Sequence, residues 1–312
     1  MREIQLKAYA KINLSLDVLG VLPNGYHEVK MVMQQLELFD LVTIRWQEYN
    51  EPRESDGIEV ITNRPDLPLD KGNIAYRAAE LMINKFEKNG HVQILIEKNI
   101  PVAAGLAGGS ANGAAVLHGL NHVWALGLSI AELCEIGIQI GADIPFCIMG
   151  QARGNDCLGP TMINDPLAAS CALAEGIGEK LKPLPPLDSW ILLSKPPISV
   201  STAEVYQGID QEMIANNVMH PDTNQLIEGL FEKNHHKIVQ NMLNVLELFS
   251  LKRYPIIVYT KNMIDKEHPM KSLMSGSGPT VFAIYLKKSD AEKAFKKLCQ
   301  YNQETFISKT LL

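Results

Sequence analysis

The sequence has few of the residues that build disulfide frameworks or structural metal sites. Its 312 residues include five cysteines and eight histidines. The cysteines are widely spaced and odd in number, and no Cys-x-x-Cys or His-Glu-x-x-His pattern occurs. This usage indicates a reducing compartment and argues against a disulfide-stapled scaffold or a structural zinc. The five cysteines are Cys134, Cys147, Cys157, Cys171 and Cys299.

Long apolar runs and an excess of basic residues are also missing. No apolar stretch approaches the roughly 18 residues of a membrane helix. The N-terminal segment Met-Arg-Glu-Ile lacks the apolar core of a cleaved signal. We therefore expect a cytoplasmic protein with no membrane partner. The formal net charge of -6 argues against a nucleic-acid partner, because binding a phosphate backbone requires a basic surface.

What is present is the composition of a soluble globular protein, with 46% apolar and 21% charged residues. A chain of this length fits two domains. Strand and helix patterns follow one another irregularly, which predicts a mixed α+β fold and not a doubly wound sheet. The segment Pro-Leu-Pro-Pro-Leu-Asp at 183–188 is the best position for a boundary. It gives an N-terminal domain of residues 1–184 and a C-terminal domain of residues 185–312.

The first hundred residues carry the clearest element patterns. Apolar and polar residues alternate from Leu6 to Val18, which predicts a strand with one buried face and one polar face. A turn should follow at 23–25. The later elements expected here are strand over 29–46, an irregular connection over 47–72 with a short strand at 58–62, a helix over 73–86 and a strand over 91–97.

Three later segments also have local signatures. Ser129 and Glu132 have the spacing of a capping box, which predicts a helix that ends at Gly141. The apolar residues 146–149 indicate a short strand. Residues 190–194 indicate another strand, just after the expected domain boundary.

A glycine-rich segment is expected to connect the strand at 91–97 to a helix. Gly105, Gly108, Gly109 and Ser110 would let backbone N–H groups approach an anion at the start of that helix. A flexible loop with Ser110 as the helix N-cap fits the same residues equally well. The segment is not a P-loop, because no Gly-Lys-Ser/Thr follows, and its spacing does not match a dinucleotide fingerprint.

A phosphate-binding loop without its own lysine needs a cation from elsewhere. Lys11 is a candidate, because it shares the polar face of the first strand with Asn13, about 7 Å along the strand. Both side chains could then reach one ligand. The alternative is a solvated lysine on an open sheet face.

Asp143, in Gly-Ala-Asp-Ile-Pro at 141–145, is a candidate general base for an acceptor hydroxyl. Phosphoryl transfer depends on positioning and charge neutralisation more than on covalent chemistry. A carboxylate, a lysine and a phosphate-binding helix would therefore suffice. The alternative is that Asp143 is a turn or N-cap residue, a common role for an aspartate close to a proline.

Three segments together resemble the GHMP kinase superfamily, which contains galactokinase, homoserine kinase and mevalonate kinase. They are Lys11, the glycine-rich segment 101–112 and the Gly-Ser-Gly-Pro-Thr turn at 276–280. Further motifs resemble one branch of that superfamily, whose acceptor carries a cytidine diphosphate in the non-mevalonate route to isoprenoid precursors. These motifs occupy residues 8–14, 25–28, 141–146, 174–179 and 199–206.

The resemblance implies a role for each matching residue. Asp143 would be the catalytic base, and Lys11 would hydrogen-bond it and stabilise the transferring phosphate. Tyr26 would stack on the cytosine and His27 would hydrogen-bond its edge, while Asn13 and Thr202 would contact the acceptor. The ATP-binding residues would be Pro101, Val102, Ala103, Ala104, Gly105, Leu106, Ala107, Gly108, Gly109, Ser110 and Ala111.

The resemblance also implies the cofactors, the partners and the architecture. ATP would be the phosphoryl donor, and magnesium would be bound mainly through ATP, with Ser110 as a candidate for an indirect contact. The only partner implied is a small molecule carrying a cytidine diphosphate, with no obligatory protein partner. The fold would be the two-domain α+β architecture of these kinases, with the active site in the cleft between domains.

The largest departure from the family pattern is an apparent insertion at about 153–170. Its glycines and prolines predict a surface excursion between two strands that is not part of the core. Other kinases of the superfamily, such as homoserine or phosphomevalonate kinase, remain an alternative, and so does a non-catalytic nucleotide-binding homologue. The pair Tyr26 and His27 disfavours the first, and the presence of Lys11 and Asp143 disfavours the second.

Overall fold

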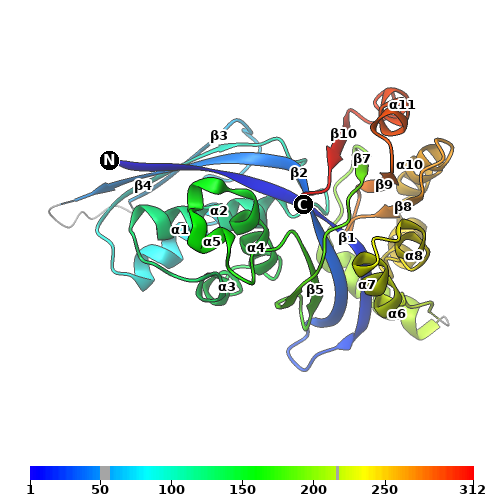
Figure 1. The fold of residues 1–312 in the computed structure, drawn as a ribbon, viewed down its shortest axis with the longest axis horizontal. Helices are drawn as coiled ribbons and strands as arrows, with labels where there is room; N and C mark the ends of the chain where they lie inside the picture. Colours follow the sequence, from blue (N-terminus) through cyan, green and yellow to red (C-terminus); the bar gives the residue numbers. More distant parts are fainter. Residues whose placement is uncertain (50–56, 216–217) are drawn as a thin grey trace. The chain divides into compact units, whose positions relative to one another are not determined.

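The computed structural model describes residues 1–49, 57–215 and 218–312. It shows a mixed α+β fold, as the sequence predicts (Figure 1). Part of the irregular connection expected over 47–72, residues 50–56, lies outside the described residues. None of the described helices combines the length and the apolar character that crossing a bilayer requires.

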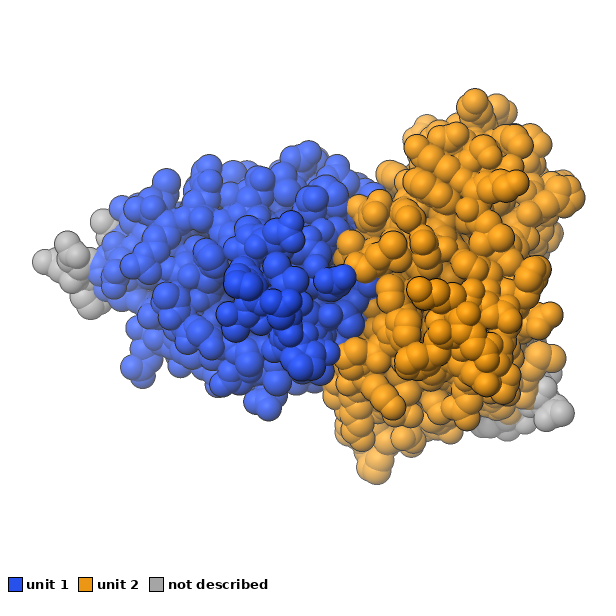
Figure 2. Space-filling view, in the orientation of Figure 1, with its two compact units in different colours: residues 1–10, 38–100, 107–170 blue, residues 11–37, 101–106, 171–312 orange. Residues whose placement is uncertain are grey.

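The described residues form two compact units, and neither unit is continuous in the sequence (Figure 2). The division of the kinase domains at residue 184 remains a prediction. The long strands β1 (Arg2–Val21) and β2 (His27–Glu48) pair with each other and contribute residues to both units. Unit 1 comprises residues 1–10, 38–100 and 107–170, and unit 2 comprises residues 11–37, 101–106 and 171–312.

In unit 1, helices pack on one side of the strands (Figure 1). The second half of β2 pairs antiparallel with β4 (Gly90–Glu97), and β3 (Ile58–Thr62) pairs parallel with β4. α2 is buried along most of its length and is rich in glycine, alanine and other apolar residues. The helices of unit 1 are α1 (Ile74–Lys85), α2 (Gly108–Val123), α3 (Ile130–Gly137), α4 (Ile144–Gly154) and α5 (Pro160–Ile163).

Unit 2 is built on the antiparallel sheet β10-β7-β9-β8. The first half of β2 also pairs with β5 (Cys171–Glu175), which pairs with β6 (Lys180–Pro183). The sheet strands are β7 (Trp190–Lys195), β8 (Lys271–Met274), β9 (Val281–Tyr285) and β10 (Glu304–Lys309). The helices are α6 (Thr202–Ala215), α7 (Thr223–Phe231), α8 (His235–Gln240), α9 (Glu247–Arg253), α10 (Pro255–Asp265) and α11 (Lys288–Leu298).

Several expected elements of unit 1 are confirmed, and two are wrong. β3, α1 and β4 lie where the patterns place them, and the Ser129–Glu132 capping box is present. The strand expected at 146–149 is instead the interior of α4, because a short apolar run fits a buried helix as well as a strand. The helix that begins after Ser129 ends at Gly137 and not at Gly141.

The segment 153–170 is more ordered and better anchored than expected. It follows a helix and not a strand, and it contains a 3₁₀ turn (Asp156–Leu158) and the short α5. Asn155 is buried: its Oδ1 accepts from Lys7 N at 2.8 Å and its Nδ2 donates to Lys7 O at 3.1 Å. One amide side chain therefore satisfies both backbone groups of a β1 residue, as a neighbouring strand would. The expectation that this segment lies wholly outside the core is wrong at Asn155.

Candidate active site

Lys11 and Asn13 lie on the part of β1 that belongs to unit 2. Lys11 Nζ donates to Asn13 Oδ1 at 3.0 Å, and both side chains are buried. Asn13 Nδ2 in turn lies 3.4 Å from Met31 Sδ. The alternative of a solvated lysine on an open face is therefore wrong, and so is the expectation of a single buried face, since β1 is buried on both faces from Ala8 to Val18. A buried lysine is costly unless its ammonium group is hydrogen-bonded or its charge is neutralised. The burial of Lys11 therefore indicates a role other than solubility.

The first half of the glycine-rich loop, residues 101–106, is fixed beside Lys11. Lys11 N donates to Leu106 O at 3.1 Å, and Ser275 Oγ donates to Gly105 O at 2.9 Å. Gly105 has a φ of 72°, and a Cβ at this position would lie 2.2 Å from Ser275 O. Only glycine fits, because any side chain would both strain the backbone and collide with the neighbouring turn.

The turn at 275–278 completes this cluster in unit 2. Gly276 has a φ of 56°, and a Cβ there would lie 3.6 Å from Asn13 Oδ1. Asn244 Nδ2 donates to the carbonyl oxygens of Met274 and Gly276, both at 2.8 Å, and so fixes the turn. Residues from four distant parts of the chain thus meet around Lys11.

Thr202 reaches the same turn from the start of α6. Its Oγ1 lies 2.9 Å from Ser277 Oγ, and either hydroxyl can donate. Of the residues predicted from the sequence, unit 2 therefore brings together Lys11, Asn13, Thr202 and the loop 101–106.

The second half of the loop begins α2 in unit 1. Ala107 occupies the N-cap position in a left-handed conformation with a φ of 57° and makes no side-chain capping bond. Gly108, Gly109 and Ser110 form the first turn, whose backbone N–H groups have no acceptor within an α-helix. Such donors, together with the helix dipole, bind anions. The alternative that made Ser110 the N-cap is wrong, since the helix begins before it.

The glycines of α2 also have a packing role. A Cβ on Gly109 would lie 3.1 Å from Ile74 Cδ1, and one on Gly113 would lie 2.8 Å from Ile74 Cγ2. These positions let α2 approach α1 closely. Gly108 is different, because a Cβ at this position would lie 3.1 Å from a polar atom, Lys98 Nζ.

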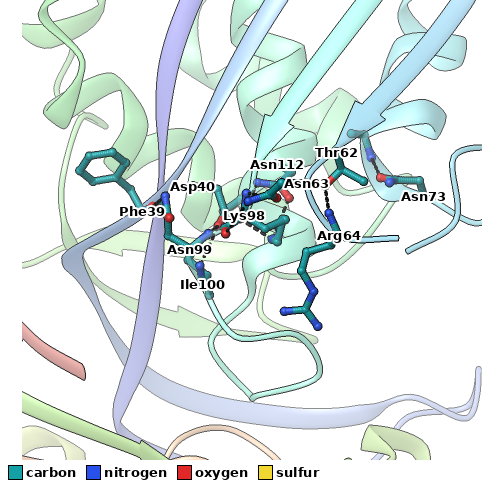
Figure 3. A network of polar contacts seen from close by, with 12 residues as sticks. Phe39, Asp40, Thr62, Asn63, Arg64, Asn73, Lys98, Asn99, Ile100 and Asn112 are labelled. Atoms are coloured by element: carbon teal, nitrogen blue, oxygen red, sulfur yellow. Dashed lines mark hydrogen bonds and ion pairs between the residues drawn. The ribbon is translucent and has the colours of Figure 1, made fainter. Parts of the chain in front are cut away.

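Lys98 belongs to a buried polar network beneath the start of α2 (Figure 3). Its Nζ forms an ion pair with Asp40 Oδ2, and Asn112 Nδ2 donates to the same oxygen at 2.8 Å. Asp40 Oδ1 accepts from the backbone N–H groups of Asn99 and Ile100 at 2.7 and 2.8 Å. The network joins β2, the end of β4 and α2, so it fixes the place where the glycine-rich loop leaves the sheet.

Asp143 lies at the N-cap position of α4, with Pro145 in the first turn. Its side chain makes no capping hydrogen bond to that helix. The alternative is therefore confirmed in part: Asp143 lies in the turn before α4, but its carboxylate does not cap the helix. Capping does not explain an aspartate at this position.

Tyr26 and His27 lie at the start of β2 in unit 2. The turn before them is closed by Asn24 Oδ1, which accepts from Tyr26 N at 3.1 Å, and Tyr26 is 59% exposed. His27 Nε2 lies 2.8 Å from Asp210 Oδ1. The His27 ring also contacts the ring of Tyr206, with 4.9 Å between centroids.

Five residues in these clusters were not predicted as site residues from the sequence. Tyr206 and Asp210 follow Thr202 at intervals of four, so the three share one face of α6, and that spacing is a usable signal. Asp40 is a charged residue within an apolar strand segment, which indicates a buried partner. No neighbouring residue in the sequence identifies that partner. The five residues are Asp40, Lys98, Asn112, Tyr206 and Asp210.

Comparison with known proteins identifies the family. The models described as "GHMP kinases N terminal domain" and "GHMP kinases C terminal" match residues 73–151 and 225–304. A 4-diphosphocytidyl-2-C-methyl-D-erythritol kinase from Alkaliphilus metalliredigens is 42% identical, covering 98% of this chain and 96% of that protein. One from Clostridioides difficile is 44% identical, covering 97% of this chain and 94% of that protein.

A solved structure agrees with these relatives. The crystal structure of a 4-(cytidine 5'-diphospho)-2C-methyl-D-erythritol kinase superposes with a TM-score of 0.77 at 25% identity, covering 98% of this chain and 99% of that one. Fold and sequence thus identify the same group of proteins. The chain belongs to the GHMP kinases and, within them, to the family of the 4-diphosphocytidyl-2-C-methyl-D-erythritol kinases.

Proposed function

We propose that this kinase transfers the γ-phosphate of ATP directly to a hydroxyl of 4-diphosphocytidyl-2-C-methyl-D-erythritol, with Asp143 as general base. The observation that carries the proposal is the convergence in unit 2 of Lys11, the loop 101–106, the turn at 275–278 and Thr202. These segments coincide with the motifs of the family. The acceptor follows the names of the relatives, which match nearly the whole chain.

The phosphate groups of ATP would be bound by backbone donors. The N–H groups of Gly108, Gly109 and Ser110 at the start of α2 suit an anion, and the glycines give the backbone access to it. Lys11 would add positive charge to the transferring phosphate, which the loop itself lacks. Asp143 would accept the proton of the acceptor hydroxyl, a role typically worth about 10²–10⁴ in rate.

Magnesium would enter with the phosphates of ATP and neutralise part of their charge. Among the described residues no group of three or more His, Cys, Asp or Glu side chains could hold a metal ion. The Ser110 hydroxyl, in the first turn of α2, is the side chain that we place near the ion.

The cytidine end of the acceptor would be bound at the start of β2. Tyr26 offers an exposed ring for stacking, and His27 offers a ring nitrogen for the base edge. Asn13 and Thr202 would contact the remainder of the acceptor. We further propose a cytoplasmic enzyme with no obligatory protein partner, whose kinase domains divide near residue 184.

A coupled ADP-release assay with a panel of acceptors tests the proposal. We expect turnover with the cytidine-bearing acceptor and background rates with homoserine, mevalonate and phosphomevalonate. Asp143→Asn should fold normally and lose about 10²–10⁴ in turnover. Asp156→Asn, an exposed aspartate in the 3₁₀ turn after α4, is the matched control.

Three results would contradict it. Faster turnover with another acceptor would assign a different GHMP kinase activity, and nucleotide binding with no turnover would assign a non-catalytic homologue. Near-wild-type turnover in folded Asp143→Asn would remove Asp143 as the base. Lys11→Ala tests the lysine in the same way, since turnover per folded molecule should fall strongly.

A further inference from the structure

Among the described residues, the His27 ring is hydrogen-bonded at one of its two nitrogens. Nε2 lies 2.8 Å from Asp210 Oδ1, and the side chains of His27 and Asp210 are 11% and 40% exposed. A carboxylate can only accept, so the ring nitrogen facing it carries the proton. The Tyr206 ring packs against the imidazole at 4.9 Å and an interplanar angle of 44°, which restrains its rotation.

The position of Asp210 on α6 makes this contact a stable one. Tyr206 and Asp210 are one helical turn apart, so a single rigid element supplies both contacts to His27. The helix is itself tied to α9: Glu204 accepts from Arg253 Nε at 3.2 Å, and Lys252 pairs with Glu212. Its first residue, Thr202, is bonded to Ser277.

A proton fixed on Nε2 decides what Nδ1 can do. In a neutral imidazole one nitrogen is a donor and the other an acceptor. Since Nε2–H donates to Asp210, Nδ1 is left as an acceptor. An acceptor matches the exocyclic amine of cytosine, which donates, and opposes the carbonyl that uracil has at the same position, which accepts.

We propose that Asp210 is a specificity-determining residue: by fixing the Nε2–H tautomer of His27, it makes Nδ1 an obligate acceptor that selects a cytosine-bearing acceptor over a uracil-bearing one. This rests on the proposed function, in which His27 contacts the base. In this proposal Asp210 acts through its contact with His27, so it is a positioning residue and not a catalytic one.

The first arm of the test reads the tautomer without using activity. The protein is labelled with ¹⁵N-histidine and studied by NMR at pH 8, above the usual histidine pKa of about 6.5. The His27 resonances are assigned from their loss in His27→Gln. In the wild type we expect Nε2 protonated and Nδ1 unprotonated, whereas Asp210→Asn should populate both tautomers, because an amide can donate as well as accept. The reverse tautomer in the wild type would overturn the inference.

The second arm measures selectivity in the intact enzyme. We expect the wild type to prefer the cytidine-bearing acceptor over its uridine analogue in kcat/KM, and CDP over UDP in calorimetric binding. In Asp210→Asn that preference should fall by roughly 10–100-fold, the size expected when a mismatched buried hydrogen bond is relieved, with KM for ATP unchanged. Gln211→Ala, an exposed change on the same helix, should leave the preference intact.

The outcomes separate this inference from the proposed function. A wild-type enzyme that phosphorylates neither nucleoside-diphosphate acceptor contradicts the proposed function, while the NMR and the CDP and UDP binding data still decide the role of Asp210. Turnover with an unchanged preference in Asp210→Asn contradicts the inference alone. An equal loss of selectivity in Gln211→Ala would assign the effect to the helix as a whole and would also overturn the inference.

Discussion

Asp40 and Asp210 are two aspartates that bind nitrogen donors in different surroundings. Asp40 is fully buried in unit 1 and accepts from two backbone N–H groups, the Asn112 amide and Lys98. The side chain of Asp210, in unit 2, is 40% exposed and accepts a hydrogen bond from His27. Burial makes the first carboxylate essential to stability, whereas the second can change binding without much effect on folding.

Replacing each aspartate with alanine is the strongest test of whether burial decides its effect on stability. Asp40→Ala should lower the free energy of unfolding by about 3–5 kcal/mol, because it leaves the buried Lys98 ammonium without its counter-ion and two backbone donors without their acceptor. Asp210→Ala should lower it by less than about 1 kcal/mol, as exposed pairs do. Urea denaturation of each variant measures both values. If Asp210→Ala destabilises as much as Asp40→Ala, the distinction based on burial is wrong.

A buried histidine extends the comparison to the pH dependence of stability. His118, in α2, donates through Nε2 to Ile148 O at 2.9 Å, and burial lowers its pKa to about 4. The unfolded chain binds a proton near pH 6.5 and the folded chain does not, so stability should fall as the pH drops from about 6.5 to 4. The loss can reach about 3 kcal/mol, since each pKa unit corresponds to 1.36 kcal/mol.

The His118→Gln variant tests this assignment. Over the same pH range its free energy of unfolding should fall by less than that of the wild type, whatever its absolute stability. His122→Gln, an exposed position on the same helix, should keep the wild-type slope. Equal slopes in the wild type and His118→Gln would show that another group titrates.

Asn155 offers a smaller test of the same distinction within the segment 153–170. Asn155→Ala should lower the free energy of unfolding by about 1–3 kcal/mol, because it removes a buried amide that bonds both the N–H and the C=O of Lys7. Asn164→Ala, at the exposed end of α5, should change stability by less than about 0.5 kcal/mol. Thermal denaturation separates the two. Equal stability of Asn155→Ala and the wild type would mean that the segment is a passive surface loop after all.

The smallest effect is expected at the exposed hairpin of unit 2. Tyr26→Ala should raise KM for the cytidine-bearing acceptor about tenfold, since stacking a base on an aromatic ring is worth roughly 1–3 kcal/mol. His27→Ala should act in the same direction. KM for ATP should stay unchanged in both. Steady-state kinetics measure this, and a parallel rise for both substrates would indicate a collapsed hairpin.

Local patterns in the sequence predicted an element well where residues close together in the chain determine it. The capping box at Ser129 acts within a few residues, and its helix begins where expected. The strand expected at 146–149 failed because an apolar run of that length carries no period. The polar face of β1 was misjudged for a different reason: alternation predicts which side chains are polar, and not what covers them.

The site shows the same limit. The motifs placed Lys11, Asn13, Thr202 and the loop 101–106, and the structure brings these together. The partners of His27 and Asp40 could not be predicted, because 183 residues separate His27 from Asp210 and 58 separate Asp40 from Lys98. Such contacts are decided by tertiary packing, which leaves no local trace in a single sequence.

The discontinuity of unit 2 has a consequence for how the protein is made. Its first strand segment begins at Lys11, yet that segment hydrogen-bonds Leu243 and Val245 through Leu16, and the loop 101–106 bonds Ser275. During synthesis this part of β1 cannot form these hydrogen bonds until the ribosome has added more than two hundred further residues. Contacts of such long sequence separation slow folding, so nascent chains would expose one edge of this apolar strand for much of translation. We expect chains stalled before residue 275 to depend on chaperones, because an exposed strand edge promotes aggregation.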